Sequence, residues 1–139
     1  MKILLDTNIL LTYLSGREDP STPACERIVR MCADGEIEGA VAFHSLSTVW
    51  YVTRKAPEAL RREYIKTICV LFTIEGAKND AVLEAVGNLP FRDFEDALQD
   101  CCAREAGCDY IVTANTRDYI GHSMIPAITP EGFIASFTK

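Results

Sequence analysis

The chain has 139 residues, of which 48% are hydrophobic, and its 20 acidic and 14 basic residues give a net charge of −6. This length accommodates one domain with a substantial core, and the acidic balance disfavours a general nucleic-acid coat protein. The N-terminal apolar run of three residues is too short for a signal peptide or a membrane span, so we expect one domain over residues 1–139, a cytoplasmic location and no membrane association.

The first half of the chain alternates between short apolar runs and segments with helical periodicity. The short runs predict strands at Lys2–Leu5, Gly39–Phe43 and Cys69–Ile74. The periodic segments predict helices at Ile9–Leu14, Pro23–Cys32 and within residues 44–55. The first of these helices should end at Ser15 and Gly16, because glycine is favoured at the C-terminal end of a helix.

The second half contains the clearest helix, in the segment DFEDALQDCCAREAG at residues 93–107. Its apolar residues recur at i, i+3, i+4 and i+7, and Gly107 stands at its C-terminal end. A helix closed by Gly87 is predicted before it, with Asn79 or Asp80 at its start. A strand at Asp109–Thr113, a loop, and then a last strand and helix follow, with Thr129 as cap and Pro130 in the first turn.

This order of elements predicts a three-layer α/β/α sandwich around a mostly parallel sheet. In such a sheet the polar residues that follow the strands gather at the carboxyl edge. Asp6 follows the first strand, Thr48 lies just beyond the second, and Asp118 follows the strand at Asp109–Thr113. Asp93 and Asp96 open the long helix, so we expect several carboxylates at one edge of the sheet.

Carboxylates gathered in this way indicate metal-assisted hydrolysis of a phosphodiester bond. Close carboxylates repel one another unless they are protonated or share a hard divalent cation, for which Mg²⁺ or Mn²⁺ is the natural choice. Such an ion polarises a phosphoryl oxygen and lowers the pKa of a bound water, so that no protein nucleophile is needed.

Each acid also has a purely structural interpretation. Asp6 is a possible N-cap of the first helix, although Thr7 and Asn8 are equally good caps and we expect them to take that role. Asp93 is a typical N-cap, and Asp96 stands in a first helical turn, where the helix dipole favours any acid. Asp118 is equally consistent with an ordinary turn residue.

The cysteines predict neither a disulfide scaffold nor a zinc site. They lie in apolar, periodic surroundings without CxxC spacing, and the two histidines are far from any cysteine pair. We therefore expect reduced core cysteines at Cys25, Cys32, Cys69, Cys101, Cys102 and Cys108.

Three motifs in order along the chain resemble the PIN domain, the nuclease domain of VapC-like toxins of bacterial toxin–antitoxin systems. They are LLDTNILL at residues 4–11, DFEDALQ at 93–99 and DYIVTANTRDY at 109–119. The resemblance extends over nearly the whole chain, including HSLSTVWYVTRK and IPAITPEGFIASF. It implies a Rossmann-like fold, an Mg²⁺- or Mn²⁺-dependent endoribonuclease activity, and a homodimer restrained by a small antitoxin protein.

The resemblance also implies roles for individual residues. Asp6, Asp96 and Asp118 match the metal-binding catalytic acids of the family. The residues in supporting positions are Asn8, Asp93, Thr113 and Asn115.

Two positions depart from the family pattern. Thr48 stands where many PIN domains carry a glutamate, with Ser45 and Ser47 as neighbours and no acid close by, and Ala114 stands where a basic residue is often found. A missing carboxylate weakens divalent binding, although a threonine hydroxyl can support a metal-bound water. A catalytically weak or inactive PIN-like module that binds RNA or protein is therefore the alternative function.

Basic residues that are candidates for RNA binding cluster in RKAPEALRREYIK, residues 54–66, and beside the proposed site. They are Arg54, Lys55, Arg61, Arg62 and Lys66 in the cluster, and Arg117 near Asp118. A solvated helix face explains the cluster equally well.

A phosphoacceptor receiver domain also sets acids at the strand ends of a doubly wound sheet. It needs an acidic pair after the first strand and a lysine after a late strand. This chain has the single acid Asp6 at the first place, and TANTRD at residues 113–118 contains no lysine. We therefore favour the nuclease over the receiver.

Overall fold

The computed structural model describes residues 1–137, which form a five-stranded, wholly parallel sheet with helices on both faces. The strand order is β3-β2-β1-β4-β5. The strands are β1 (Lys2–Leu5), β2 (Glu38–Ala42), β3 (Thr73–Glu75), β4 (Tyr110–Val112) and β5 (Ala127–Ile128). The most central strand is β1, whose Leu4 is in register with Ala40 of β2 and with Ile111 of β4.

The helices flank these strands, and several of them begin at a capping side chain or a proline. They are α1 (Thr7–Ser15), α2 (Thr22–Ala33), α3 (Phe43–Val52), α4 (Glu58–Leu71), α5 (Asn79–Gly87), α6 (Phe94–Glu105) and α7 (Pro130–Phe137), with a short 3-10 helix η1 (Thr116–Asp118). Gly16 and Gly107 adopt the positive φ values, 62° and 71°, that follow the ends of α1 and α6. Thr129 caps α7 by accepting the Gly132 amide at 3.0 Å, as predicted.

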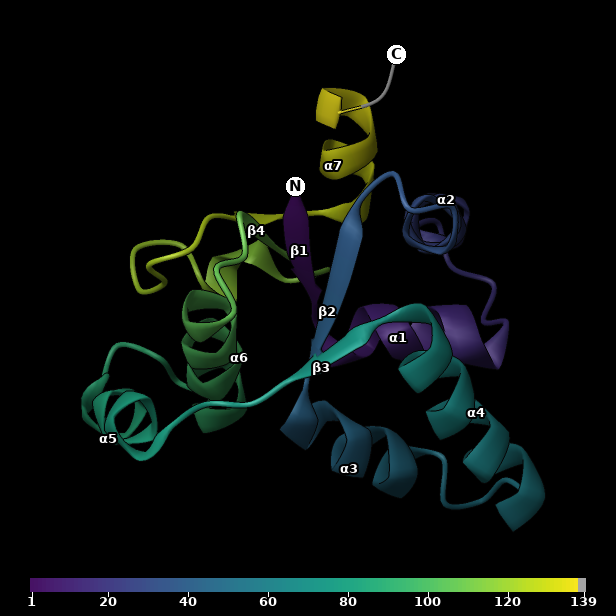
Figure 1. The fold of residues 1–139 in the computed structure, drawn as a ribbon, viewed down its shortest axis with the longest axis horizontal. Coiled ribbons are helices and arrows are strands. Elements are labelled where there is room, and N and C mark those ends of the chain that lie inside the picture. The colour runs from purple at the N-terminus through teal and green to yellow at the C-terminus, as the bar shows by residue number, and fades with distance from the viewer. Residues whose placement is uncertain (138–139) are drawn as a thin grey trace.

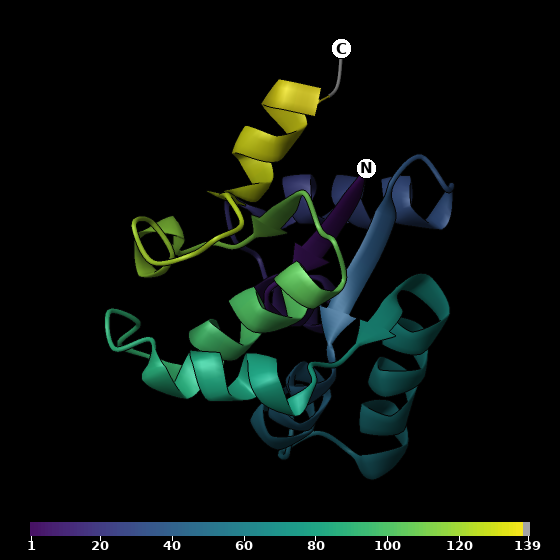
Figure 2. The same cartoon turned by 60° about the vertical axis from the view of Figure 1, so that its left-hand side comes forward.

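Two hydrophobic cores flank the sheet because side chains alternate along each strand. Ile3 and Leu5 pack with α1, α2, α4 and α7, whereas Leu4 points to the other face and packs with α5 and α6. In Figure 1 the strands β1 and β2 run downward between these two helical layers, toward the starts of α1 and α3. Figure 2 brings α5 and α6 forward, where they lie together in front of the sheet. The predicted three-layer sandwich is confirmed.

The predicted strand at Cys69–Ile74 is wrong over its first half. Cys69, Val70 and Leu71 end the long helix α4, which the sequence reading did not place, and the strand β3 begins only at Thr73. Packing overrides the β-propensity of these residues, because the helical register buries Ile68 and leaves Val70 exposed to solvent.

The region of β2 shows one difference from the prediction and one close packing contact. Phe43, predicted as the end of a strand, begins α3. Gly39 in β2 has no room for a side chain, because a Cβ atom there would lie 2.7 Å from the Phe72 ring and 2.8 Å from Cys32 Sγ. The buried Phe72 ring, at the junction of α4 and β3, thus requires glycine in the neighbouring strand.

The six cysteines are free thiols, but not all of them lie in the core. Cys25, Cys101, Cys102 and Cys108 are buried, and burial raises the pKa of Cys25 to about 11 and of Cys102 to about 12. Cys69 is exposed on α4, so the expectation of a core position is wrong there. None of the helices within residues 1–137 combines the length and apolarity needed to cross a membrane.

Candidate functional site

Three predicted acids meet at the carboxyl edge of the sheet. Asp6 directly follows β1, Asp96 lies in the first turn of α6, and Asp118 ends η1 after β4. All three line one cavity of about 190 Å³. The same cavity is also lined by Thr7, Asn8, Thr48, Asp93, Glu95, Gln99 and Asn115.

Asp6 is the most enclosed of the three acids, with 8% of its surface exposed. Its Oδ2 accepts hydrogen bonds from Thr113 Oγ1 at 2.8 Å and from Tyr119 OH at 3.4 Å. Its Oδ1 accepts the Thr7 amide at 2.7 Å and Gln99 Nε2 at 3.4 Å. Burial raises the pKa of Asp6, and these hydrogen bonds oppose the rise only in part.

Asp6 is also the N-cap of α1, so the expectation that Thr7 or Asn8 would take this role is wrong. The end of β1 places the Asp6 carboxylate over the first helical amide, while Thr7 is already inside the helix and its hydroxyl donates to Ser45 Oγ at 2.8 Å. The cap and the site role therefore coincide in one residue. Asn8 is exposed and lines the cavity.

Asp96 lies among other negative charges. Its Oδ1 accepts a hydrogen bond from Tyr119 OH at 3.1 Å. Partial burial, followed by the charges of Asp6 and Asp93, raises the pKa of Asp96 to about 7, and Asp118 adds to the rise. At neutral pH and without a cation, Asp96 is thus divided between its protonated and ionised forms.

The loop after β4 positions Asp6 through a short chain of hydrogen bonds. Asn115 N donates to Thr113 Oγ1 at 3.1 Å, and Thr113 Oγ1 in turn donates to Asp6. Thr113 is completely buried, which fixes the direction of its hydroxyl. The structure therefore brings the predicted supporting residues Thr113 and Asn115 together with Asp6.

The first turn of α6 lies against α3. Asp93 caps α6 by accepting the Glu95 amide at 2.8 Å, which is the structural role considered for it. Thr48 Oγ1 donates to Glu95 Oε1 at 2.7 Å. The expectation that no acid lies close to Thr48 is therefore wrong, because the fold brings a glutamate from 47 residues away in the sequence.

The sequence reading missed three residues of this site. One is Glu95, and another is Tyr119, whose buried hydroxyl connects Asp6 with Asp96 and which directly follows Asp118 in the sequence. The third is Gln99, which is 1% exposed. Its position three residues after Asp96, on the same face of a helix, is a signal that the sequence does contain.

A larger cleft of about 760 Å³ continues from the cavity. It shares Asp93, Asp96, Asn115 and Asp118 with the cavity. It adds the side chains of Pro90, Arg92, Arg117, Ile120 and His122. Cationic and apolar groups thus lie directly beside the carboxylates.

The predicted basic cluster is a separate region. Arg54, Lys55, Arg61 and Arg62 line neither of these two cavities. Arg61 Cζ lies 3.9 Å from the centroid of the Trp50 ring, and its Nη2 donates to the Trp50 carbonyl at 2.6 Å.

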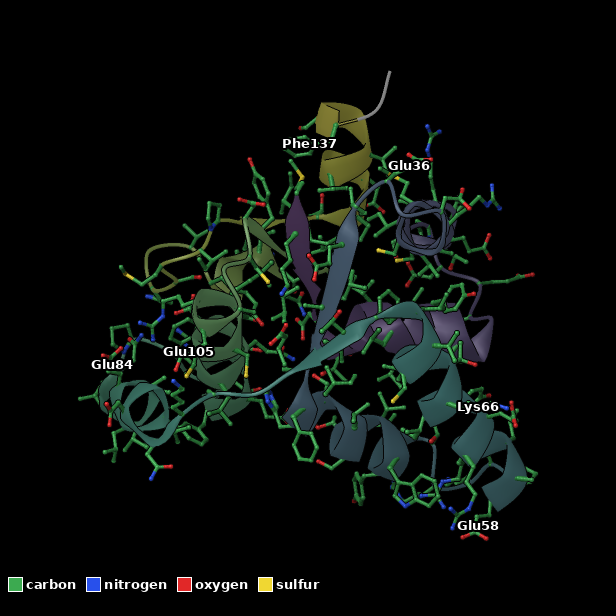
Figure 3. The ribbon with its side chains drawn as sticks, viewed as in Figure 1. Glu36, Glu58, Lys66, Glu84, Glu105 and Phe137 are labelled. Atoms are coloured by element: carbon green, nitrogen blue, oxygen red, sulfur yellow. The ribbon has the colours of Figure 1, made fainter. Side chains whose placement is uncertain are left out.

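Arg54 and Arg62 of this cluster also have contacts close to them in the chain. Arg54 lies over the Tyr51 ring, and Arg62 pairs with Glu58 at 3.4 Å. Glu58 and Lys66 point outward from α4 in Figure 3. These contacts favour the solvated helix face over a prepared RNA site.

The oxygen donors of the site suit a hydrated hard cation better than a closed cage of ligands. Within the described residues, no three His, Cys, Asp or Glu side chains already form a metal-binding group. Mg²⁺, however, is usually held by one or two carboxylates and several waters. The mutual repulsion around Asp96 and the buried Gln99 Oε1, which has no hydrogen-bond partner in the described part of the chain, both fit such an ion.

Comparisons with known proteins agree with this architecture. The PIN domain pattern matches residues 2–117, whereas no curated protein matches the sequence. Among solved structures, VapBC-1 from nontypeable Haemophilus influenzae superposes with a TM-score of 0.70 at 13% identity, over 94% of this chain and 99% of that one. A toxin–antitoxin complex from Klebsiella pneumoniae gives 0.67 at 19% identity, over 92% and 97% of the two chains. VapC20 from Mycobacterium tuberculosis, described as a sarcin-ricin loop cleaving toxin, gives 0.59 at 18%, over 78% and 86%.

Proposed function

The chain belongs to the PIN domain family, and from this premise we propose that it is a divalent-metal-dependent endoribonuclease and the toxin of a toxin–antitoxin pair. The observation that carries the proposal is the position of Asp96. It lies beside Asp6 and Asp118 at the carboxyl edge, with a pKa raised to about 7 by burial and by like charges. Such mutual repulsion persists in a fold when a cation relieves it.

Asp6 and Asp96 would hold Mg²⁺ or Mn²⁺, with Asp118 at the mouth of the same cavity. The bound ion would polarise the phosphodiester and acidify a water molecule. Thr113 and Tyr119 fix the direction of the carboxylates by donating hydrogen bonds to them. These side chains thus act as positioning residues, and the chain supplies no nucleophile of its own.

The larger cleft suits an RNA strand. Arg92 and Arg117 line it together with the acids, and their guanidinium groups can bind phosphates that flank the cleaved bond. Ile120 is 65% exposed in the same cleft and offers an apolar surface for a base. The acids would therefore face the reacting phosphate, while the arginines hold its neighbours.

An antitoxin partner and a homodimer belong to the same proposal. The neighbours from Haemophilus influenzae and Klebsiella pneumoniae were solved as toxin–antitoxin complexes. Large apolar side chains stand exposed on α3 and near α5, as partner-binding surfaces require, among them Phe43, Tyr51, Leu83, Val86 and Leu89.

The direct test is cleavage of a single-stranded RNA with Mn²⁺ and with a chelator. We expect cleavage with the metal only, and a loss of about 100-fold or more in Asp96→Asn. Asp34→Asn is the matched control, because Asp34 is exposed at the end of α2 and lines neither cavity. RNA binding by the wild type without any cleavage would instead support the alternative, a PIN-like binding module.

A further inference from the structure

The first turn of α6 carries two adjacent acids, Glu95 and Asp96. Glu95 is exposed, yet its side chain is not free to rotate, because Thr48 Oγ1 donates to Glu95 Oε1 at 2.7 Å. Thr48 belongs to α3, so this hydrogen bond joins two elements that meet at the carboxyl edge of the sheet. The threonine therefore holds the Glu95 carboxylate in one direction.

That direction places Glu95 in the site. Glu95 lines the cavity of about 190 Å³ together with Asp6, Asp96 and Asp118. Thr48 occupies one oxygen of Glu95, which leaves the second oxygen for a ligand.

Gln99 gives an independent indication that this cavity takes a ligand. Gln99 is 1% exposed, and its Nε2 donates to Ser45 Oγ at 2.9 Å, to Thr7 Oγ1 at 3.2 Å and to Asp6 Oδ1 at 3.4 Å. Because the Asp6 carboxylate only accepts, the nitrogen must face it and the amide orientation is fixed. Gln99 Oε1 is then left without a hydrogen-bond partner among residues 1–137, although Gln99 lines the cavity. Water carried by a bound cation would satisfy this oxygen.

We propose that Glu95, held by Thr48, is the fourth carboxylate of the site and binds the hydrated divalent ion through its water shell, beside Asp6 and Asp96. This inference rests on the proposed metal-dependent function. It places the acid that α3 lacks at Thr48 on α6 instead, one residue before Asp96. Thr48 on α3 and Glu95 on α6 together thus replace a single carboxylate on α3.

The test is calorimetric titration of Mn²⁺ into the purified full chain, which needs no RNA and no turnover. We expect Glu95→Gln to weaken Mn²⁺ binding about tenfold or more, and Thr48→Val, which removes only the positioning hydroxyl, to weaken it about threefold. Glu105→Gln is the matched control on the same helix, because Glu105 is exposed and accepts a hydrogen bond from Lys78 N beside α5 (Figure 3). It should bind Mn²⁺ like the wild type.

A relocation experiment separates a positioned carboxylate from a general charge effect. The double variant Thr48→Glu with Glu95→Gln has the same net charge as the wild type and moves the carboxylate to α3. We expect it to recover most of the affinity that Glu95→Gln loses. If Glu95→Gln and Thr48→Val both bind Mn²⁺ like the wild type while Asp96→Asn does not, Glu95 takes no part in binding the ion, although the proposed function stands. If Asp96→Asn also binds normally, the metal site itself is wrong.

Discussion

Two aspartates one turn apart on α6 have opposite surroundings. Asp100 is 2% exposed, and its Oδ1 accepts the Met124 amide at 3.1 Å, the Ile125 amide at 3.4 Å and the Ser123 hydroxyl. Arg104 Nε lies 3.6 Å from its other oxygen. Asp96 accepts one hydrogen bond, from Tyr119, and otherwise faces carboxylates.

Asp100 therefore stabilises the fold, whereas the ionised form of Asp96 destabilises it. The donors around Asp100 tie α6 to the loop before β5, and these hydrogen bonds stabilise the fold. Partial burial and the like charges around Asp96 make its ionisation unfavourable in the metal-free protein. The first turn of α6 is therefore suited to binding, and its next turn to stability.

The largest effect on stability should come from Asp100→Ala. This change leaves two loop amides without their acceptor and removes one of the two acids that pair with Arg104, so we expect a loss of about 2–4 kcal/mol in the free energy of unfolding. Urea unfolding followed by circular dichroism measures it. The affinity for Mn²⁺ under native conditions should not change. A large change in that affinity would contradict the assignment of ion binding to the first turn of α6 alone.

The opposite sign is expected for Asp96→Asn in the metal-free protein. The folded-state pKa of Asp96, about 7, lies above the usual value of about 3.9 for an unfolded chain, so the folded state binds more protons between these values. Wild-type stability should therefore fall as pH rises from about 4 to about 7, and Asp96→Asn should remove this part of the slope.

Above about pH 7 we expect Asp96→Asn to be more stable than the wild type by about 1–2 kcal/mol, a value reduced for the partial exposure of Asp96. Thermal unfolding in a chelator over this pH range tests the claim, with Asp34→Asn as control. A parallel slope in the two proteins would show that the carboxylates around Asp96 do not repel it.

Addition of metal should reverse the order of stability, so that the wild type becomes more stable than Asp96→Asn. Mn²⁺ at about 100 times its dissociation constant stabilises a folded site by about 2.7 kcal/mol, and we expect wild-type unfolding to shift accordingly while Asp96→Asn shifts little. Because the proton and the ion compete for Asp96, the wild-type affinity should rise as pH increases through about 7. Titration at several pH values measures this trend, and an affinity independent of pH would count against Asp96 as a ligand.

A smaller effect is expected from Tyr119→Phe, which removes a hydroxyl whose single hydrogen is shared between Asp96, at 3.1 Å, and Asp6, at 3.4 Å. We expect a loss of about 0.5–1.5 kcal/mol of stability and a further rise in the pKa of Asp96, because its ionised form loses a donor. Carbon NMR of the Asp96 carboxyl follows this pKa. An unchanged value would mean that the Tyr119 hydroxyl does not position the acids.

The smallest effect on stability, within about 0.5 kcal/mol, is expected from Arg117→Gln, because Arg117 lies in an exposed 3-10 turn. Its expected effect lies in RNA binding, where the logarithmic salt slope should decrease by about one unit. Arg62→Gln on α4 is the control and should leave the slope unchanged, since Arg62 pairs with Glu58. Equal changes of the salt slope in Arg117→Gln and Arg62→Gln would indicate that the basic cluster on α4 also binds RNA.

The sequence predicted the layers and the edge at which the acids meet, because strand ends in a parallel sheet converge whatever the side-chain details. It did not predict α4, since the β-forming Val70 lies in the last turn of a helix that is held by the burial of Ile68. A contact between elements far apart in sequence, such as that of Glu95 with Thr48, leaves no local pattern. That residues 1–139 form a single domain remains a prediction.

The dual role of Asp6 has a similar explanation. Capping and site residues both prefer aspartate at the end of a strand, so the sequence alone cannot assign Asp6 to one of the two roles. The structure assigns its Oδ1 to the Thr7 amide and its Oδ2 to Thr113 and Tyr119. Only the direction of the two oxygens, which depends on tertiary packing, resolves the question.

The hydrogen bond between Thr113 and Asp6 spans 107 residues of sequence, and this separation has a consequence for folding. Contacts of such long range form late, because closing a long loop costs entropy before strand pairing contributes any stabilising free energy. A nascent chain that has not yet released β4 and η1 from the ribosome holds Asp6 but lacks Thr113, Asp118 and Tyr119. The carboxylate cluster therefore assembles only when almost the whole chain is available, so the proposed site is complete only late in synthesis.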